Sequence, residues 1–231
     1  MRRQQPRLVR RDQKRSRNSN QLQNTSGFDH RSGATMWEPR GHADMDAAVI
    51  TASRDADLDV FLLHNDGYST VCGHAIIATM TLAFETGLVA RTGDRRELTI
   101  NVPAGRIHAP AHMDGDRVNC VSFRNVPSFV YRHDQHIHVP SIGSVRFDIA
   151  YGGAFYALVE APPLEPTLVL SELNRLIDLG RRLEHAVMAT TPIAHPFESD
   201  LSFSYGTIFT GPALSWRRPQ EQPGTRSSVT I

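Results

Sequence analysis

The order of apolar and polar positions divides the chain into a patterned body between two polar ends. Residues 1–28 are rich in Gln, Asn, Ser and Arg and show neither a helical nor a strand period, which predicts a disordered arm. Apolar patterning begins near Met36 and ends near Pro212, after which Arg, Gln, Pro and Ser return. We therefore expect a folded body followed by a second disordered tail over residues 214–231.

Short β-type runs dominate the body. Gly and Pro residues and an Asn-Asp-Gly turn signal at residues 65–67 separate these runs, as is usual between strands. The pattern predicts strands over residues 47–51, 57–63, 97–102, 106–111, 117–123, 144–151 and 154–160, with a further short run over 202–209.

Two segments have the pattern of helices. Residues 75–88 are apolar on nearly every face, which predicts a helix that is buried on all sides and ends at Gly87. Residues 171–189 are amphipathic, with Ser171 as a suitable N-cap and an apolar face that includes Leu176 and Leu183. A buried helix among short strands, followed by an amphipathic helix, indicates an α+β fold.

Charge is distributed unevenly along the chain, although its formal net value is +1. Eight of the 25 basic groups but one of the 24 acidic groups lie in residues 1–20, which leaves a formal charge of −6 for the rest. We interpret the basic arm as a solvated tail. An import signal is less favoured because the arm lacks a clear amphipathic stripe, and nucleic-acid binding because it has no aromatic side chains for stacking on bases.

The location of the protein is predicted from what the chain lacks and from its cysteines. It contains no run of eighteen apolar residues, so we expect no membrane span. Two cysteines form a poor disulfide framework and are not spaced for zinc, which favours a reducing compartment and a cytoplasmic location.

Cys72 lies between the turn signal and the first predicted helix. Free N–H groups and the helix dipole favour negative charge at a helix start, so we expect a lowered thiol pKa and a useful thiolate there. Gly73 permits close approach of a ligand, and the N–H groups of Gly73 and His74 are suited to hold a carboxylate. Because a cysteine at a helix start is more often a small buried hydrophobe, spacing alone leaves both interpretations open. Cys120, within a strand pattern, is expected to be a packing residue.

Five collinear segments decide between those interpretations. They are residues 36–45 (MWEPRGHADM), 64–74 (HNDGYSTVCGH), 122–129 (SFRNVPSF), 148–156 (DIAYGGAFY) and 200–211 (DLSFSYGTIFTG). Together they resemble the proline racemases and the related trans-3-hydroxy-L-proline dehydratases, over about residues 29–213. Five boxes in the same order are far more specific than one isolated motif.

The resemblance implies a diaminopimelate-epimerase-like fold of two α/β halves, each with strands wrapped around a central helix and with the active site between them. It implies that Cys72 removes the substrate α-proton and that Gly73 and His74 bind the substrate, which is proline or hydroxyproline. It implies no metal, no PLP and no nucleotide cofactor. A homodimer is compatible with the resemblance, and neither nucleic acid nor membrane is expected as a partner.

Within this scheme, residues 29–190 are expected to form the first half, with its central helix at 72–88 and a further helix at 171–189. Residues 191–213 would begin the return segment. The family's second catalytic box, an Asp-Arg-Ser-Pro stretch followed by Cys in racemases or Thr in dehydratases, has no counterpart in this sequence. Asp46 stands where the family usually has an aromatic residue.

These departures lead to the expectation of a truncated family member whose second half is incomplete. The residues of the matching segments favour a trans-3-hydroxy-L-proline dehydratase-like protein. A proline or hydroxyproline racemase or epimerase, and a catalytically inactive family member, are the alternatives.

Overall fold

The computed structural model describes residues 34–42, 45–65, 67–89, 96–161, 168–212 and 226–230. The predicted disordered arm at 1–28 and, from the predicted tail, residues 214–225 and 231 lie outside these ranges. The chain divides into two compact units, of which the first comprises the chain up to Pro127 together with Pro196–Leu201, and the second comprises Ser128–His195 and the chain from Ser202 onward. Residues 29–190, which are predicted to form a single half, therefore include the change of unit between Pro127 and Ser128.

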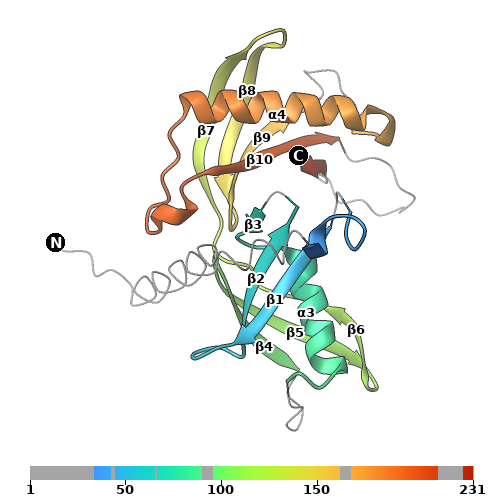
Figure 1. The fold of residues 1–231 in the computed structure, drawn as a ribbon. Coiled ribbons are helices and arrows are strands. Elements are labelled where there is room, and N and C mark those ends of the chain that lie inside the picture. Colours follow the sequence, from blue (N-terminus) through green and yellow to red (C-terminus); the bar gives the residue numbers. More distant parts are fainter. Residues whose placement is uncertain are drawn as a thin grey trace, which may run out of the picture. The chain divides into compact units, whose positions relative to one another are not determined.

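The first unit is built on a six-stranded sheet (Figure 1). Strands β2 and β4 run parallel and the other neighbouring strands run antiparallel. Because β2 ends at His64 and β3 begins at Gly67, the predicted turn joins them. In spatial order the strands are β1 (Asp46–Ala52), β2 (Leu58–His64), β4 (Glu97–Val102), β5 (Gly105–Asp114) and β6 (Arg117–Val121), with β3 (Gly67–Ser69) paired to β2.

Helix α3 (Gly73–Glu85) packs against β1, β5 and β6 of this sheet. The prediction that this helix is buried on all sides is wrong, because Ile77 and Leu82 are 40% and 47% exposed. The predicted stop is confirmed: α3 ends just before Gly87, whose φ of 73° suits a glycine. The residues of α3 that enter the core are Ala75, Ile76, Thr79, Met80, Ala83 and Phe84.

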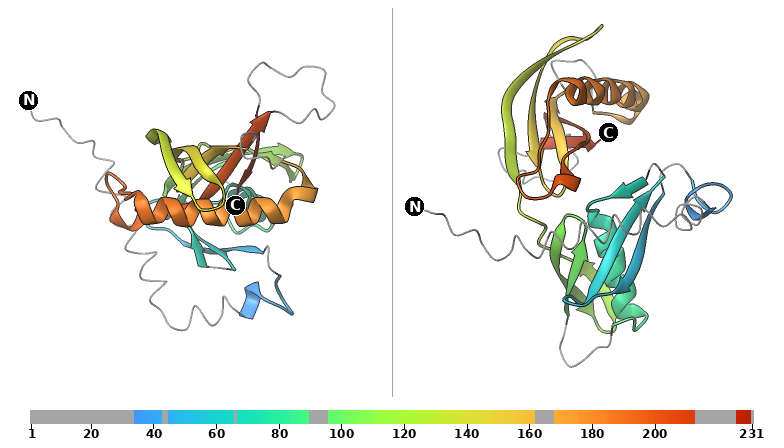
Figure 2. Two further views of the ribbon diagram at one scale, coloured as in Figure 1. Left: turned by 90° about the horizontal axis from the view of Figure 1, so that it is seen from above. Right: turned by 60° about the vertical axis from the view of Figure 1, so that its left-hand side comes forward.

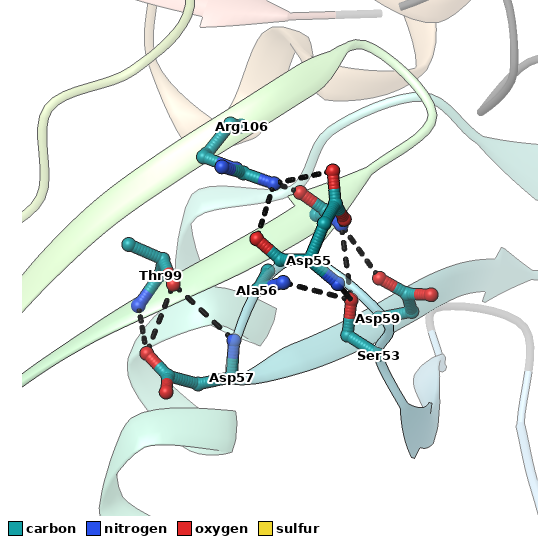
Figure 3. Close-up of polar contacts among 8 residues, drawn as sticks. Ser53, Asp55, Ala56, Asp57, Asp59, Thr99 and Arg106 are labelled. Carbon is teal, nitrogen blue, oxygen red and sulfur yellow. Dashed lines mark hydrogen bonds and ion pairs between the residues drawn. The ribbon is translucent and has the colours of Figure 1, made fainter. Parts of the chain in front are cut away.

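A polar network ties the loop between β1 and β2 to strands β4 and β5 (Figure 3). Its centre is Asn101, which is 6% exposed and whose amide donates to carboxylate oxygens of Asp59 at 2.7 Å and Asp55 at 2.9 Å. The side-chain oxygen of Asn101 accepts from Arg106 Nε at 3.0 Å, and Arg106 pairs with Asp55 at 2.9 Å. Because buried polar groups need partners, this network holds the loop in one arrangement. The other members are Ser53, Ala56, Asp57 and Thr99.

The second unit is a five-stranded sheet with one helix across a face (Figures 1 and 2). Helix α4 (Leu173–Thr190) contacts β7 and β10 and buries Leu176, Leu179, Gly180, Leu183 and Val187, so its predicted amphipathic character is confirmed. A 3-10 turn, η2 (Leu170–Glu172), precedes it, and Glu172 rather than Ser171 occupies the N-cap. In spatial order the strands are β11 (Arg226–Thr230), β10 (Ser204–Pro212), β9 (Phe155–Glu160), β8 (Gly143–Tyr151) and β7 (Phe129–Val139).

Two strands of this sheet are missing from the sequence prediction. Strand β7 pairs with β8 at the sheet edge, and because most of its positions are exposed it has no continuous apolar pattern. Strand β11 pairs antiparallel with β10, so residues 226–230 are not disordered as predicted for the tail. Pairing with a distant strand, rather than local composition, determines this strand.

In the part of the chain that the structure describes, no helix combines the length and the apolar character needed to cross a membrane.

A short 3-10 turn, η3 (Ser199–Leu201), completes the first unit and buries Leu201.

Candidate active site

Cys72 is the N-cap residue of α3, as its position between a turn and an apolar helix predicts. Its backbone is extended, with φ −142° and ψ 114°, and its carbonyl accepts the first helical hydrogen bond from Ile76 at 3.1 Å. The thiol forms no capping hydrogen bond of ordinary geometry, yet the N–H groups of Ala75 and His74 face the sulfur and lower the pKa of Cys72. The helix start therefore presents its donors to the thiol.

The side chains of Asp46, Cys72 and His74 converge at this point of the first unit. Asp46 is the first residue of β1, whereas Cys72 and His74 belong to the start of α3. The Nε2 atom of His74 lies 3.2 Å from Cys72 Sγ and 2.7 Å from Asp46 Oδ2. One imidazole nitrogen thus contacts both the thiol and the carboxylate.

The carboxylate determines which way the histidine can act. An ionised carboxylate only accepts hydrogen bonds, so the 2.7 Å contact requires that Nε2 carry a proton and donate it to Asp46. A protonated Nε2 cannot accept a proton from Cys72. At this geometry His74 is therefore not a base that deprotonates the thiol, and its one Nε2 proton is donated to Asp46.

Burial outweighs the helix start in setting the acidity of Cys72. Desolvation of the half-buried sulfur raises the pKa of Cys72, and the negative charge of Asp46 raises it further. The backbone N–H groups of Ala75 and His74 lower it, but the net pKa is raised above the ordinary thiol value. The predicted lowering of the Cys72 pKa is therefore wrong in its net direction, although the predicted contribution of the helix start is present.

Gly73 is tightly packed as well as close to the thiol. A Cβ atom at this position would lie 3.0 Å from the ring atom Cζ of Phe123. Real Cβ contacts are rarely this short, so a side chain here would require the Phe123 ring, which follows β6, to move by a few tenths of an ångström. Close packing is thus one physical reason for a glycine at position 73, beside the approach of a ligand.

The structure corrects the prediction for Cys120 and adds Asp46 to the surroundings of Cys72. Cys120 is an exposed residue of β6, so the prediction that it is a packing residue is wrong. Asp46 was predicted only as a departure from the family pattern, and its place beside Cys72 was not predicted. No local signal indicates it, because Asp46 lies 28 residues before His74 and reaches it through the packing of β1 on α3.

Comparisons with known proteins identify relatives of this chain. The chain is 48% identical over 184 residues to a trans-3-hydroxy-L-proline dehydratase of Colwellia psychrerythraea, covering 79% of this chain and 52% of the relative. It is 40% identical over 198 residues to a trans-3-hydroxy-L-proline dehydratase of Bacillus cereus, covering 85% of this chain and 57% of the relative. The chain thus spans about half the length of the curated relatives it matches.

A solved structure shows the same fold. It is a hydroxyproline epimerase from Agrobacterium vitis with bound trans-4-hydroxy-L-proline, at a TM-score of 0.81 and 25% identity, covering 93% of this chain and 60% of that one. The expected α+β, diaminopimelate-epimerase-like fold is therefore confirmed. The family model described as "Proline racemase" matches residues 14–226, a range that includes the first sheet, strands β7 to β10 of the second and helices α3 and α4. With most of its length matched by that model, the chain belongs to the proline racemase family.

Proposed function

We propose that the protein acts as a trans-3-hydroxy-L-proline dehydratase-like enzyme in which Cys72 removes the α-proton of the substrate. The observation that carries the proposal is the position of Cys72 at the N-cap of α3, with the N–H groups of Ala75 and His74 facing its sulfur. Donors arranged before the reaction stabilise an anionic base without later reorganisation. The names of the two dehydratase relatives support the same reaction.

The reaction proceeds by loss of a proton and a hydroxyl group from adjacent carbons. The Cys72 thiolate takes the proton from the α-carbon, and the electron pair of that C–H bond forms a double bond to C3. The C3–O bond breaks, and the hydroxyl leaves as water after taking up a proton from solvent; the Cys72 thiol then returns its proton to solvent, so that water is lost overall. The N–H group of Gly73 is assigned to the substrate carboxylate, where a hydrogen bond stabilises the carbanion-like transition state, whereas the N–H group of His74 faces the Cys72 sulfur.

The raised pKa of Cys72 gives this proposal a pH dependence. A thiol whose pKa lies above its ordinary value is mostly protonated at neutral pH, and the reactive thiolate accumulates as the pH rises. We therefore expect the rate of α-proton removal to increase toward alkaline pH, with its midpoint above the ordinary thiol value. A rate that falls through the same range would contradict Cys72 as the base.

The test is turnover by the purified chain in D₂O, followed by proton NMR. The substrates are trans-3-hydroxy-L-proline, trans-4-hydroxy-L-proline and L-proline. We expect dehydration of the first, and Cys72→Ser should lower its rate by roughly 10²- to 10⁴-fold, the usual contribution of a positioned general base. The matched control is Cys120→Ser, which changes the other, exposed cysteine and should leave the rate unchanged. Turnover that survives Cys72→Ser, or no turnover of any of the three, would refute the proposal.

A hydroxyproline epimerase is the second candidate, favoured by the structural similarity to the epimerase from Agrobacterium vitis. The same NMR experiment separates the two, because epimerisation inverts the α-carbon and incorporates deuterium there without forming a double bond. Absence of both products and of α-deuterium would instead support the catalytically inactive alternative. A homodimer and a cytoplasmic location stay predictions from the sequence.

A further inference from the structure

Asp46, Cys72 and His74 supply three different metal-ligand groups at one point. Their ligand atoms all lie within 4.8 Å of one another, and they comprise a thiol sulfur, an imidazole nitrogen and a carboxylate oxygen. Mixed sulfur, nitrogen and oxygen donors suit Zn²⁺, which binds four ligands tetrahedrally with bonds of about 2.0–2.3 Å. Cys72 and His74 are neighbours at the start of α3, whereas Asp46 reaches them through the packing of β1 on α3, so the fold completes the group.

We infer that Asp46, Cys72 and His74 form a binding site for Zn²⁺ or a similar thiol-binding divalent cation. Three protein ligands leave the fourth position to water, the arrangement of an exchangeable rather than a closed structural site. The cation is assigned a blocking role, because the family resemblance implies a reaction without metal. Occupation of the site ties up the Cys72 sulfur, so it inhibits proton removal; this consequence rests on the proposed function, whereas the binding itself does not.

The distances require a small adjustment that the exposure of the side chains permits. Ligand atoms of a tetrahedral zinc site are about 3.3–3.6 Å apart, as follows from its bond lengths. Cys72 Sγ and His74 Nε2, now 3.2 Å apart, must separate by a few tenths of an ångström, and Nε2 and Asp46 Oδ2, now 2.7 Å apart, by roughly half an ångström. The side chains of His74 and Asp46 are 73% and 38% exposed, which leaves both able to turn.

Metal binding also requires changes in protonation that balance. The thiol proton of Cys72 is released to solvent as the S–Zn bond forms. His74 presents the lone pair of Nε2 once its proton is carried on Nδ1 instead, and Asp46 accepts the cation in place of the imidazole N–H. The hydrogen bond between His74 and Asp46 is thus exchanged for two bonds to the metal.

Asp46 supplies the oxygen ligand of this site. Cation binding is therefore expected to depend on Asp46 as well as on Cys72, unlike nonspecific capture by a thiol.

The probe is Co²⁺, which replaces Zn²⁺ and reports its ligands by absorption. All proteins carry Cys120→Ser, because Cys120 is exposed and pairs in register with His112 across β5 and β6. We expect a sulfur-to-cobalt charge-transfer band in the near ultraviolet and visible bands of tetrahedral Co²⁺, both lost when Zn²⁺ is added. Cys72→Ser should abolish the charge-transfer band. Asp46→Ala should weaken Co²⁺ binding by at least the roughly 10- to 100-fold that loss of an outer-shell partner costs.

The matched control for Asp46→Ala is Asp114→Ala, which removes an exposed carboxylate of β5 and should leave the Co²⁺ affinity unchanged. A charge-transfer band that persists in Cys72→Ser, or an affinity that Asp46→Ala does not change, would overturn the site. Absence of the charge-transfer band in the Cys120→Ser protein without a further substitution would also overturn the proposed site. These absorption readouts are independent of turnover, so a protein without dehydratase activity can still show the site, and an active one can lack it.

Discussion

Replacing Asp46 with asparagine removes one negative charge beside the Cys72 sulfur while nearly preserving side-chain volume. The charge of Asp46 raises the pKa of Cys72, so its removal must lower that pKa and enlarge the thiolate fraction below it. Loss of the hydrogen bond between His74 and Asp46 should also lower the pKa of Cys72. In Asp46→Asn the N–H of His74 no longer has a carboxylate acceptor and is freer to donate to the thiolate 3.2 Å away.

The size of the effect follows from the distance between the groups. Two unit charges 4.8 Å apart, the upper limit here, interact by about 0.9 kcal/mol at the dielectric constant of water and about 3.5 kcal/mol at an effective value of 20. Because the side chain of Asp46 is 38% exposed, solvent screening favours the smaller figure. An energy of about 0.9 kcal/mol corresponds to a roughly four- to fivefold increase in thiolate fraction at a pH below the thiol pKa.

The assay is the rate of Cys72 alkylation by iodoacetamide between about pH 6 and pH 9, in a Cys120→Ser background, because the thiolate is the reactive form. Asp46→Asn should react roughly four- to fivefold faster at the acidic end, and the curves should converge at alkaline pH. The difference should shrink in about 1 M salt, where the Debye length is near 3 Å. Asp114→Asn is the matched control. An unchanged profile, or one displaced to higher pH, would refute the assignment of Asp46 to the environment of the thiol.

The remaining predictions concern the stability of each unit, measured by urea unfolding followed by circular dichroism. In the first unit, Asn101→Ala removes the centre of the polar network and should lower the free energy of unfolding by about 1–3 kcal/mol. Asn119→Ala, on the exposed side of β6, should change it by less than about 0.5 kcal/mol, and equal effects would contradict the structural role of the network. In the second unit, Leu183→Ala empties a position that is 1% exposed and should cost about 2–5 kcal/mol. Met188→Ala, at 50% exposure on the same helix, should cost less than about 0.5 kcal/mol, and a comparable loss would show that α4 is packed differently.

Much of the fold is readable from local patterns. Strands β4, β8 and β9 lie within one residue of their predicted bounds, because alternation and Gly or Pro boundaries are local properties. The prediction for α3 is correct in kind but not in burial, since an apolar composition cannot say how many sides of a helix the sheet covers. β7 and β11 were missed because each depends on pairing with another strand more than on its own residues.

The sequence by itself determined that Cys72 begins a helix, because a turn signal, a glycine and an apolar run meet there, and five collinear motifs indicated the family. The tertiary structure decided the chemical environment of that thiol. It brought Asp46 to His74 across 28 residues of chain and set the burial that raises the Cys72 pKa. It also left Cys120 exposed. Electrostatics and desolvation depend on which groups lie within a few ångströms in space, and the order of residues specifies this only after the strands have paired and the helix has packed.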